Sequence, residues 1–92
     1  MKTKVIFRKE EGGVIAIFPY IISSTARKTV LCYSHNEGHS DCDYMGIIHN
    51  SKPASQTDAN NLLKELVLSY GYENLEIIQK AILSKVYGQF YK

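Results

Sequence analysis

The chain has 92 residues, of which 45% are hydrophobic and 22% are charged, and its formal net charge is +2. This length allows one small domain, which buries roughly 60–65% of the surface of the unfolded chain. The composition excludes intrinsic disorder, and the small net charge is unlike the strongly basic character of most nucleic-acid-binding domains. We therefore expect a single globular domain over residues 1–92.

Residues 4–18 carry the pattern of a β-hairpin. Lys4–Arg8 alternates between polar and apolar side chains, which is the period of a half-buried strand. Two glycines at 12–13 supply the turn, because glycine tolerates positive φ angles. Residues 14–18 are apolar throughout and end at Pro19, which predicts a second strand that is covered on both faces.

The middle of the chain predicts two more strands. Residues 20–28 have no clean period and indicate a connection. Residues 29–34 are rich in β-branched and aromatic side chains, which favours a third strand. Residues 35–43 are polar and predict a loop, and residues 44–49 predict a fourth strand that Gly46 weakens.

One amphipathic helix is predicted over residues 56–70. Ser55 can accept a hydrogen bond from the first turn, and Asp58 follows three residues later, as in a capping box. Gly71 suits the left-handed position that ends a helix, and Leu68 is expected to face solvent. Apolar residues with helical spacing form the buried face: Ala59, Leu62, Leu63, Leu66, Val67 and Tyr70.

A short fifth strand is predicted at residues 75–78, and residues 80–92 form either a short helix or an arm that reaches a neighbouring molecule. The predicted fold is therefore α+β, in the order β-β-β-β-α-β. An antiparallel sheet of four to five strands packs one face against the amphipathic helix. Such a small core leaves little net stability, which association can raise, so we expect a homodimer.

Four possible metal ligands lie between Cys32 and Cys42, in a C-x2-H-x3-H-x2-C arrangement with His35 and His39. Zinc favours four nitrogen or sulfur ligands in a tetrahedron, and these spacings are similar to those of structural sites. Established sites, however, usually draw their ligand pairs from two elements joined by a longer loop. Two interpretations stay open: a zinc-stabilised module, or two reduced cysteines beside a polar loop, with no cofactor.

Neither a phosphate-binding glycine loop nor a serine-hydrolase elbow occurs in the sequence, so we expect no enzyme and no catalytic residues. Seven tyrosines are more than a small core needs, and tyrosine is favoured at protein interfaces. The leading hypothesis is a small regulatory module that binds an unidentified protein. Its binding surface is expected at the loop over residues 33–44 and comprises Tyr33, His35, His39 and Tyr44.

A nucleic-acid-associated domain is a second alternative, although Glu10 and Glu11 dilute its basic residues and we do not expect nucleic acid as the main partner. The candidate basic patch comprises Lys2, Lys4, Arg8, Lys9, Arg27 and Lys28. The opening residues lack the apolar stretch of a secretory signal, and the longest apolar run, residues 14–22, is too short to span a membrane. We therefore expect a cytoplasmic protein without membrane contacts.

The opening KVIFRKEEGGVIAIFP, residues 4–19, resembles the start of HicB-type antitoxin domains, whose β-β-β-α-β order is also similar. Over most of its length the chain is similar to a group of short uncharacterised bacterial proteins often associated with mobile elements or phages. This likeness rests on residues 4–19, on His35 and His39 followed by Asp43-Tyr44, on Lys52-Pro53-Ala54 and on residues 72–78. It implies a shared fold without an activity. The histidines match better than the cysteines, which favours a binding surface over a zinc site.

Overall fold

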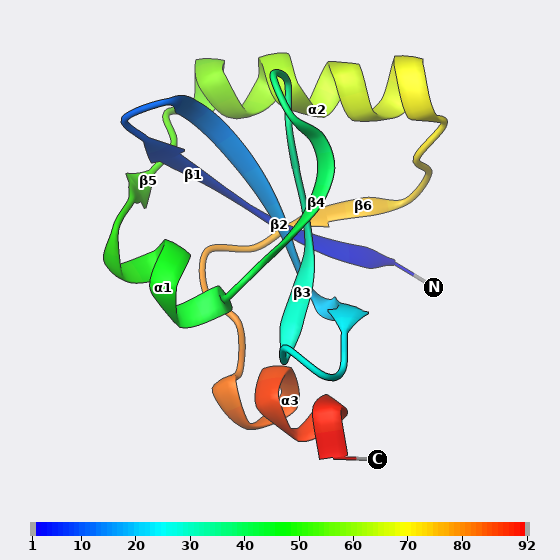
Figure 1. Ribbon diagram of the computed structural model, residues 1–92. Coiled ribbons are helices and arrows are strands. Elements are labelled where there is room, and N and C mark those ends of the chain that lie inside the picture. Colours follow the sequence, from blue (N-terminus) through cyan, green and yellow to red (C-terminus); the bar gives the residue numbers. More distant parts are fainter. Residues whose placement is uncertain (1, 92) are drawn as a thin grey trace.

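The computed structural model describes residues 2–91, so residues 1 and 92 of the expected domain lie outside the described part (Figure 1). The fold is α+β, as the sequence predicted. The elements in chain order are β1 (Thr3–Glu10), β2 (Gly13–Ser24), β3 (Thr29–Ser34), β4 (Gly38–Cys42), α1 (Tyr44–His49), β5 (Lys52–Pro53), α2 (Gln56–Tyr70), β6 (Leu75–Ile77), α3 (Leu83–Gly88) and a final 3-10 turn (Gln89–Tyr91).

All the strands within residues 2–91 belong to one sheet. Its order is β4-β3-β2-β1-β5, and β6 pairs with β1 beside β5. Strands β1 to β4 are consecutive antiparallel neighbours. β6 instead runs parallel to the first residues of β1, from Thr3↔Leu75 to Val5↔Ile77. The sheet is therefore antiparallel, as predicted, except for this pair. α2 carries the chain from the end of β1, beside β5, back to its start, and β6 then runs in the same direction as β1.

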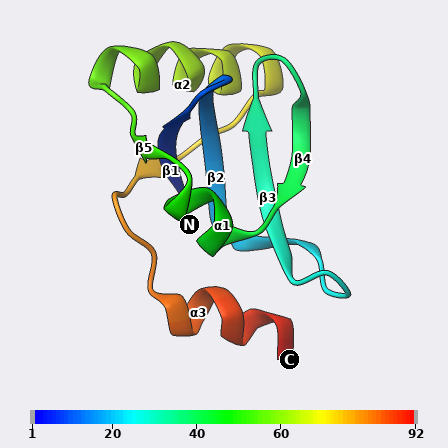
Figure 2. The ribbon, with the colours of Figure 1, turned by 60° about the vertical axis from the view of Figure 1, so that its left-hand side comes forward.

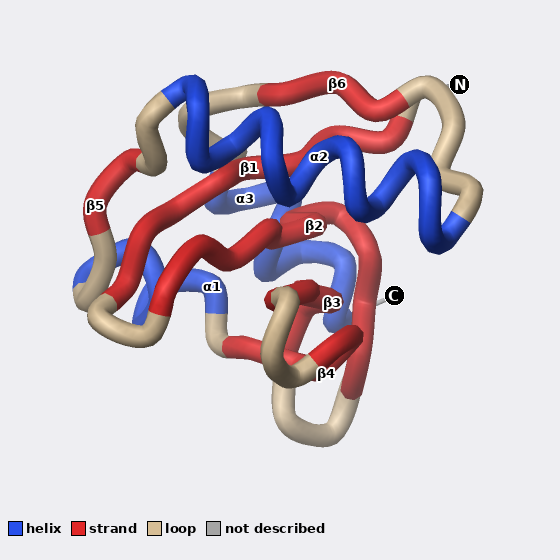
Figure 3. The backbone as a smooth tube through the Cα atoms, turned by 90° about the horizontal axis from the view of Figure 1, so that it is seen from above, coloured by secondary structure: helices blue, strands red, loops and turns tan. Residues whose placement is uncertain are grey.

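Both faces of the sheet are covered, which confirms the prediction that the strand at residues 14–18 is buried on two sides. Helix α2 covers one face and lies along β1 and β2 (Figure 3). α1 and α3 cover the other face. The sequence predicted α3 as one of two alternatives for residues 80–92, but it did not predict α1. The buried residues on the α2 face are Val5, Phe7, Ala16, Phe18, Tyr33, Ala59, Leu62 and Leu66. Those on the opposite face are Ile6, Ile15, Ile17, Val30, Cys32, Cys42, Tyr44 and Val86.

Helix α2 confirms the predicted helix at both ends. The Ser55 hydroxyl accepts a hydrogen bond from the Asp58 backbone N–H at 3.2 Å, which satisfies a donor of the first turn. Gly71 ends the helix with a φ of 72°, a left-handed conformation that glycine adopts without a steric penalty. Leu68 is 81% exposed, as expected for a residue opposite the buried face.

Residues 44–49 form α1, so the predicted fourth strand there is wrong. Asp43 is the N-cap of this helix, and its carboxylate accepts a hydrogen bond from the Gly46 N–H at 3.1 Å. At the other end, the Asn50 N–H donates to the Gly46 carbonyl. A short apolar run does not by itself distinguish a buried strand from a buried helix, and here the capping residues decide for the helix.

The fourth strand lies at Gly38–Cys42, within the segment predicted as a loop. Only residues 35–37 form the turn, and Gly38, with a φ of 74°, closes it in the left-handed conformation. β4 then pairs with β3 from Ser34↔Gly38 to Val30↔Cys42. The polar composition of this segment predicted a loop instead of a strand. A strand at the end of a sheet tolerates charged and polar residues, so polarity alone does not exclude one.

The predicted connection at residues 20–28 also differs from the structure, since β2 continues to Ser24. Register shifts occur between Phe18 and Ile22 and again between Ile22 and Ser24. Such irregularities insert unpaired residues into a strand. They interrupt the alternation of side chains between the two faces, so the sequence shows no period of two there.

The segment at residues 80–91 packs on its own domain as a short helix and a 3-10 turn, so the alternative of an extended arm is wrong for these residues. Val86 of α3 is fully buried against the second face of the sheet. The Ile82 N–H donates to the Tyr20 hydroxyl at 2.9 Å, and the Gln89 side chain donates to the Pro19 carbonyl at 2.8 Å. Among residues 2–91, no helix has the length and apolar character needed to cross a membrane.

Candidate functional site

An aromatic cluster joins the β3–β4 hairpin to the end of α2. Tyr33 and His39 are cross-strand partners, and their ring centroids lie 4.9 Å apart. The ring of Tyr70 meets both edge-on, at 5.1 Å from Tyr33 and 4.9 Å from His39. Tyr33 is buried, whereas Tyr70 is 50% exposed. The cluster therefore has a buried base and an exposed outer side.

Tyr72, which follows the C-cap glycine of α2, completes this cluster. Its ring stacks on Phe18 of β2 at a centroid distance of 5.2 Å and an interplanar angle of 9°. The Tyr72 hydroxyl lies 2.8 Å from Nε2 of His39, within hydrogen-bond distance. Burial raises the pKa of Tyr72, which keeps this hydroxyl protonated. We call the exposed groups of His39, Tyr70 and Tyr72 the aromatic surface.

Glu65 connects α2 to the hairpin beneath this surface. Its carboxylate accepts a hydrogen bond from the buried Tyr33 hydroxyl and lies 2.8 Å and 3.0 Å from Nδ1 of His35. Burial, followed by the contact with Glu65, raises the pKa of Tyr33. The hydrogen bonds from Tyr33 and then His35 lower the pKa of Glu65. A tyrosine hydroxyl and an ionised carboxylate thus face each other at neutral pH.

The structure brings together three of the four residues that the sequence assigned to the binding surface, namely Tyr33, His35 and His39. Tyr44 does not belong to this group, and its assignment is wrong. It is buried on the opposite face of the sheet, where its hydroxyl accepts a hydrogen bond from the Ala81 N–H at 3.2 Å. The cause is the start of α1 after Asp43, which takes the chain to that face.

Sequence reasoning missed Glu65, Tyr70 and Tyr72 as members of the site. The sequence pattern places Tyr70 on the buried face of the helix. Its ring does point toward the sheet and contacts Tyr33, but the residue is half exposed. The available signal was its position in the last turn of α2, immediately before the C-cap Gly71. The end of a helix extends beyond the surface it covers, and a large side chain there is only half buried.

The four candidate zinc ligands do not meet. Cys32 and Cys42 lie among the buried residues of the face covered by α1 and α3. His35 and His39 contact residues of α2 or of the chain directly after it, on the opposite face. This separation follows from the alternation of side chains along a strand. Within residues 2–91, no three His, Cys, Asp or Glu side chains are grouped to hold a metal ion.

Both cysteines are free thiols, as expected from the sequence. The Cys32 sulfur lies 3.2 Å from the Ser40 hydroxyl oxygen. The neighbouring Cys42 thiol lowers the pKa of Cys32 to about 7, and the proximity of Cys32 in turn raises the pKa of Cys42. Because both cysteines are buried, their thiols lie in the core and not on a surface.

The six basic residues considered for a nucleic-acid-binding patch are dispersed, and four contact protein groups. Arg8 donates to the Ser51 side chain at 2.9 Å and to its carbonyl at 2.7 Å. Lys9 pairs with Asp58 at 3.1 Å. The remaining contacts are Arg27 with Asp41 and Lys28 with the Tyr91 hydroxyl and ring. Lys2 and Lys4 line a separate pocket with Lys85.

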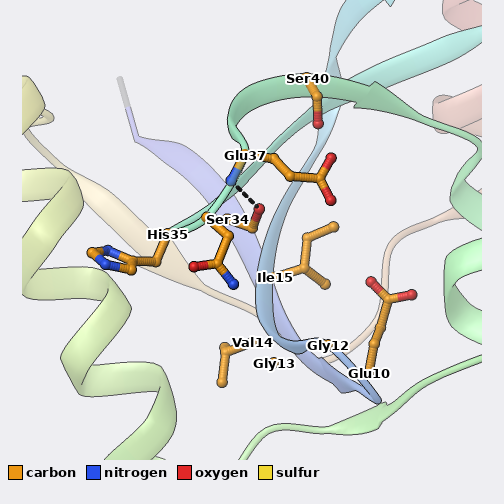
Figure 4. Close-up of a pocket in the computed structure, with 10 residues that line it drawn as sticks. Glu10, Gly12, Gly13, Val14, Ile15, Ser34, His35, Glu37 and Ser40 are labelled. Carbon is orange, nitrogen blue, oxygen red and sulfur yellow. Dashed lines mark hydrogen bonds between the residues drawn. The ribbon is translucent and has the colours of Figure 1, made fainter.

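A pocket of about 190 Å³ lies between the β1–β2 and β3–β4 turns (Figure 4). Its lining includes the carboxylates of Glu10, at the end of β1, and Glu37, in the β3–β4 turn, with Ile15 between them. The Glu37 N–H donates to the Ser34 hydroxyl at 3.3 Å, which orders the second turn. Two acidic side chains therefore line this pocket.

Comparisons with known proteins found no matching family model, no matching curated protein and no matching solved structure.

Proposed function

We propose that this protein is a small non-enzymatic binding module that acts through protein contacts made by the aromatic surface. The observation that carries this proposal is the half-exposed ring of Tyr70, held edge-on against both Tyr33 and His39. Tyrosine is enriched in interfaces and among the residues that dominate binding energy, because it offers a large apolar ring together with a hydroxyl.

The fixed geometry of the surface supports this role. Tyr72 is held by stacking on Phe18, and His39 by contacts with three tyrosine rings. Side chains that are already ordered lose little conformational entropy when a partner binds. A partner therefore keeps most of the interaction energy that the aromatic rings provide.

The charges beside the surface favour a protein over a nucleic acid. Aromatic side chains that stack on bases normally lie in a positively charged groove, which attracts the phosphate backbone. Here the carboxylate of Glu65 contacts the buried Tyr33 and His35, and Asp41, two residues after His39, is paired with the guanidinium of Arg27. Exposed aromatic rings without a positively charged groove beside them are more typical of a protein interface.

The order of the elements supports a regulatory role. β1, β2, β3, α2 and β6 follow the β-β-β-α-β order of the HicB-type domains that residues 4–19 resemble, with β4, α1 and β5 placed before α2. We therefore include regulation, in a mobile-element or phage setting, in the proposal.

The test compares capture of partner proteins by wild type, Tyr70→Ala and Tyr91→Ala, with quantification by mass spectrometry after cross-linking in the native host. Tyr91 is 70% exposed and lies in the C-terminal 3-10 turn, so it is a matched control for an exposed tyrosine. We expect Tyr70→Ala to reduce capture of the specific partner at least about tenfold, the effect of losing a dominant interface residue. Equal capture by all three proteins would overturn the proposal.

A further inference from the structure

Strand β4 forms the open end of the sheet. Within the described part of the chain, it has β3 as a neighbour on one side only (Figure 2). Every second residue of an antiparallel strand directs its N–H and C=O away from that neighbour. β4 therefore presents unpaired backbone donors and acceptors along its outer edge, which is a template for a further strand.

The other end of the sheet offers less strand length. β1 has its outer edge covered by β6 and β5, and the Ile78 and Ala54 N–H groups donate to the Val5 and Phe7 carbonyls at 2.9 Å and 3.2 Å. β6 and β5 have three and two residues, whereas β4 has five. Of the described strands at the two ends of the sheet, β4 is thus the longest.

We infer that β4 pairs antiparallel with β4 of a second copy of this chain, in a register centred on Ser40. The inference rests on the proposed function, because it identifies a second copy of this chain as the protein that binds beside the aromatic surface. A two-fold axis through such a pair makes the interface self-complementary, with each contact occurring twice.

The side chains of β4 select this register. With Ser40 on the axis, His39 of each copy lies opposite Asp41 of the other, so an imidazole meets a carboxylate twice. Centring the pair on residue 39 would place two histidines opposite each other and lose both imidazole–carboxylate contacts, and centring it on residue 41 would oppose two aspartates. Asp41 is ionised, because the neighbouring Arg27 guanidinium lowers the pKa of its carboxyl. Like charges directly opposite on adjacent strands are destabilising, whereas an imidazole N–H can donate a hydrogen bond to a carboxylate.

The same two-fold symmetry places the aromatic surfaces of both copies beside the β4–β4 interface. An axis perpendicular to the sheet keeps both α2 helices on the same face. His39, whose ring contacts Tyr70, lies on β4, the strand that forms the interface. Tyr70 of each copy therefore lies near the axis and adds apolar area beside the backbone hydrogen bonds.

The direct test is sedimentation equilibrium on the purified chain, together with isotope-filtered NMR on an equimolar mixture of labelled and unlabelled protein. We expect a dimer, with interchain backbone contacts between residues 39 and 41. A monomer at NMR concentration would overturn the inference, and so would a dimer with interchain contacts elsewhere.

Charge variants provide a second test. His39→Asp and His39→Lys both lose the imidazole contacts with the tyrosines, but only the aspartate opposes Asp41 with a like charge. Because the contact occurs twice, we expect His39→Asp to dimerise about tenfold more weakly than His39→Lys. Ile77→Lys, at the open edge of β6, is the matched control. Loss of the dimer in that variant, or equal dimerisation of the two residue 39 variants, would overturn the inference.

The two proposals fail in distinguishable ways. A purified chain that stays monomeric while Tyr70 is still required for partner capture would remove self-association and leave the binding function. If the protein forms the β4 dimer but Tyr70 is not required to capture another protein, the wider binding function is overturned. The second copy of the chain is then the partner that the experiments identify.

Discussion

The buried hydroxyl of Tyr33 in β3 donates a hydrogen bond to the carboxylate of Glu65 in α2, 32 residues further along the chain. Glu65 also holds His35 in the adjacent turn. One carboxylate therefore attaches the helix to the hairpin that carries His39. The position of the aromatic surface depends on this attachment, because Tyr33 is the buried ring on which His39 and Tyr70 rest.

Replacing Glu65 with alanine removes the acceptor of the Tyr33 hydroxyl. We expect Glu65→Ala to lower the free energy of unfolding by about 1–3 kcal/mol at pH 7, the cost of leaving a buried hydroxyl without its partner. Urea denaturation measures this change. Glu73→Ala, on the exposed segment after the helix, is the control and is expected to stay within about 0.5 kcal/mol of wild type. Equal stability of both variants would show that the Tyr33–Glu65 contact contributes nothing.

The contribution of Glu65 is also expected to depend on pH. Since the folded-state pKa of Glu65 lies below its unfolded value, its charge stabilises the fold above the unfolded pKa of about 4.3, and this stabilisation is lost as pH falls through the folded pKa. The gap between wild type and Glu65→Gln, which keeps an acceptor but no charge, should therefore shrink below about pH 4. A gap that stayed constant between pH 7 and pH 3 would contradict this explanation.

Gly71 is expected to be required for its backbone conformation rather than for space. An added methyl group at this position meets no atom within 4 Å, but the φ of 72° is unfavourable for alanine. Gly71→Ala should therefore destabilise the protein by about 1 kcal/mol. Gly88→Ala is the control, since this site is equally open and its φ is not positive. Thermal unfolding of the two variants separates strain from crowding, and equal melting temperatures would argue against strain.

The packing of α3 on the second face of the sheet can be tested within one helix. Val86 is fully buried, and Leu83 is 47% exposed three residues earlier. We expect Val86→Ala to cost about 1.5–3 kcal/mol in unfolding free energy, as for a buried aliphatic side chain, and Leu83→Ala to cost less than about 1 kcal/mol. Chemical denaturation gives both values. A negligible loss at Val86 would show that the chain after β6 contributes little to the core.

Local signals in the sequence were sufficient for α2 and for the first hairpin. Ser55 and Gly71 mark both ends of the helix, and the apolar run after Gly13 indicated a strand with two covered faces. The failures arose where local pattern and tertiary environment disagree. Residues 44–49 are apolar but capped by Asp43, and residues 38–42 are polar but pair with β3.

The candidate site was predictable only in part, for a similar reason. His35 and His39 were identifiable because two histidines in a short polar segment are conspicuous. Glu65 and Tyr70 had ordinary local explanations, as a solvated and a buried helix position. Their role becomes visible only when α2 is placed over the hairpin, which depends on contacts between residues far apart in the sequence.

The parallel pairing of β6 with β1 has a consequence for synthesis on the ribosome. The meander from β1 to β4 consists of neighbours in sequence and can form early, but β1 must wait for residues 75–77 before β6 can pair with it. Contacts that span most of a chain form late, since a long loop must close first. During elongation, β1 therefore keeps part of its backbone unpaired until residues 75–77 have been made, and the nascent protein is most exposed to mispairing at that strand.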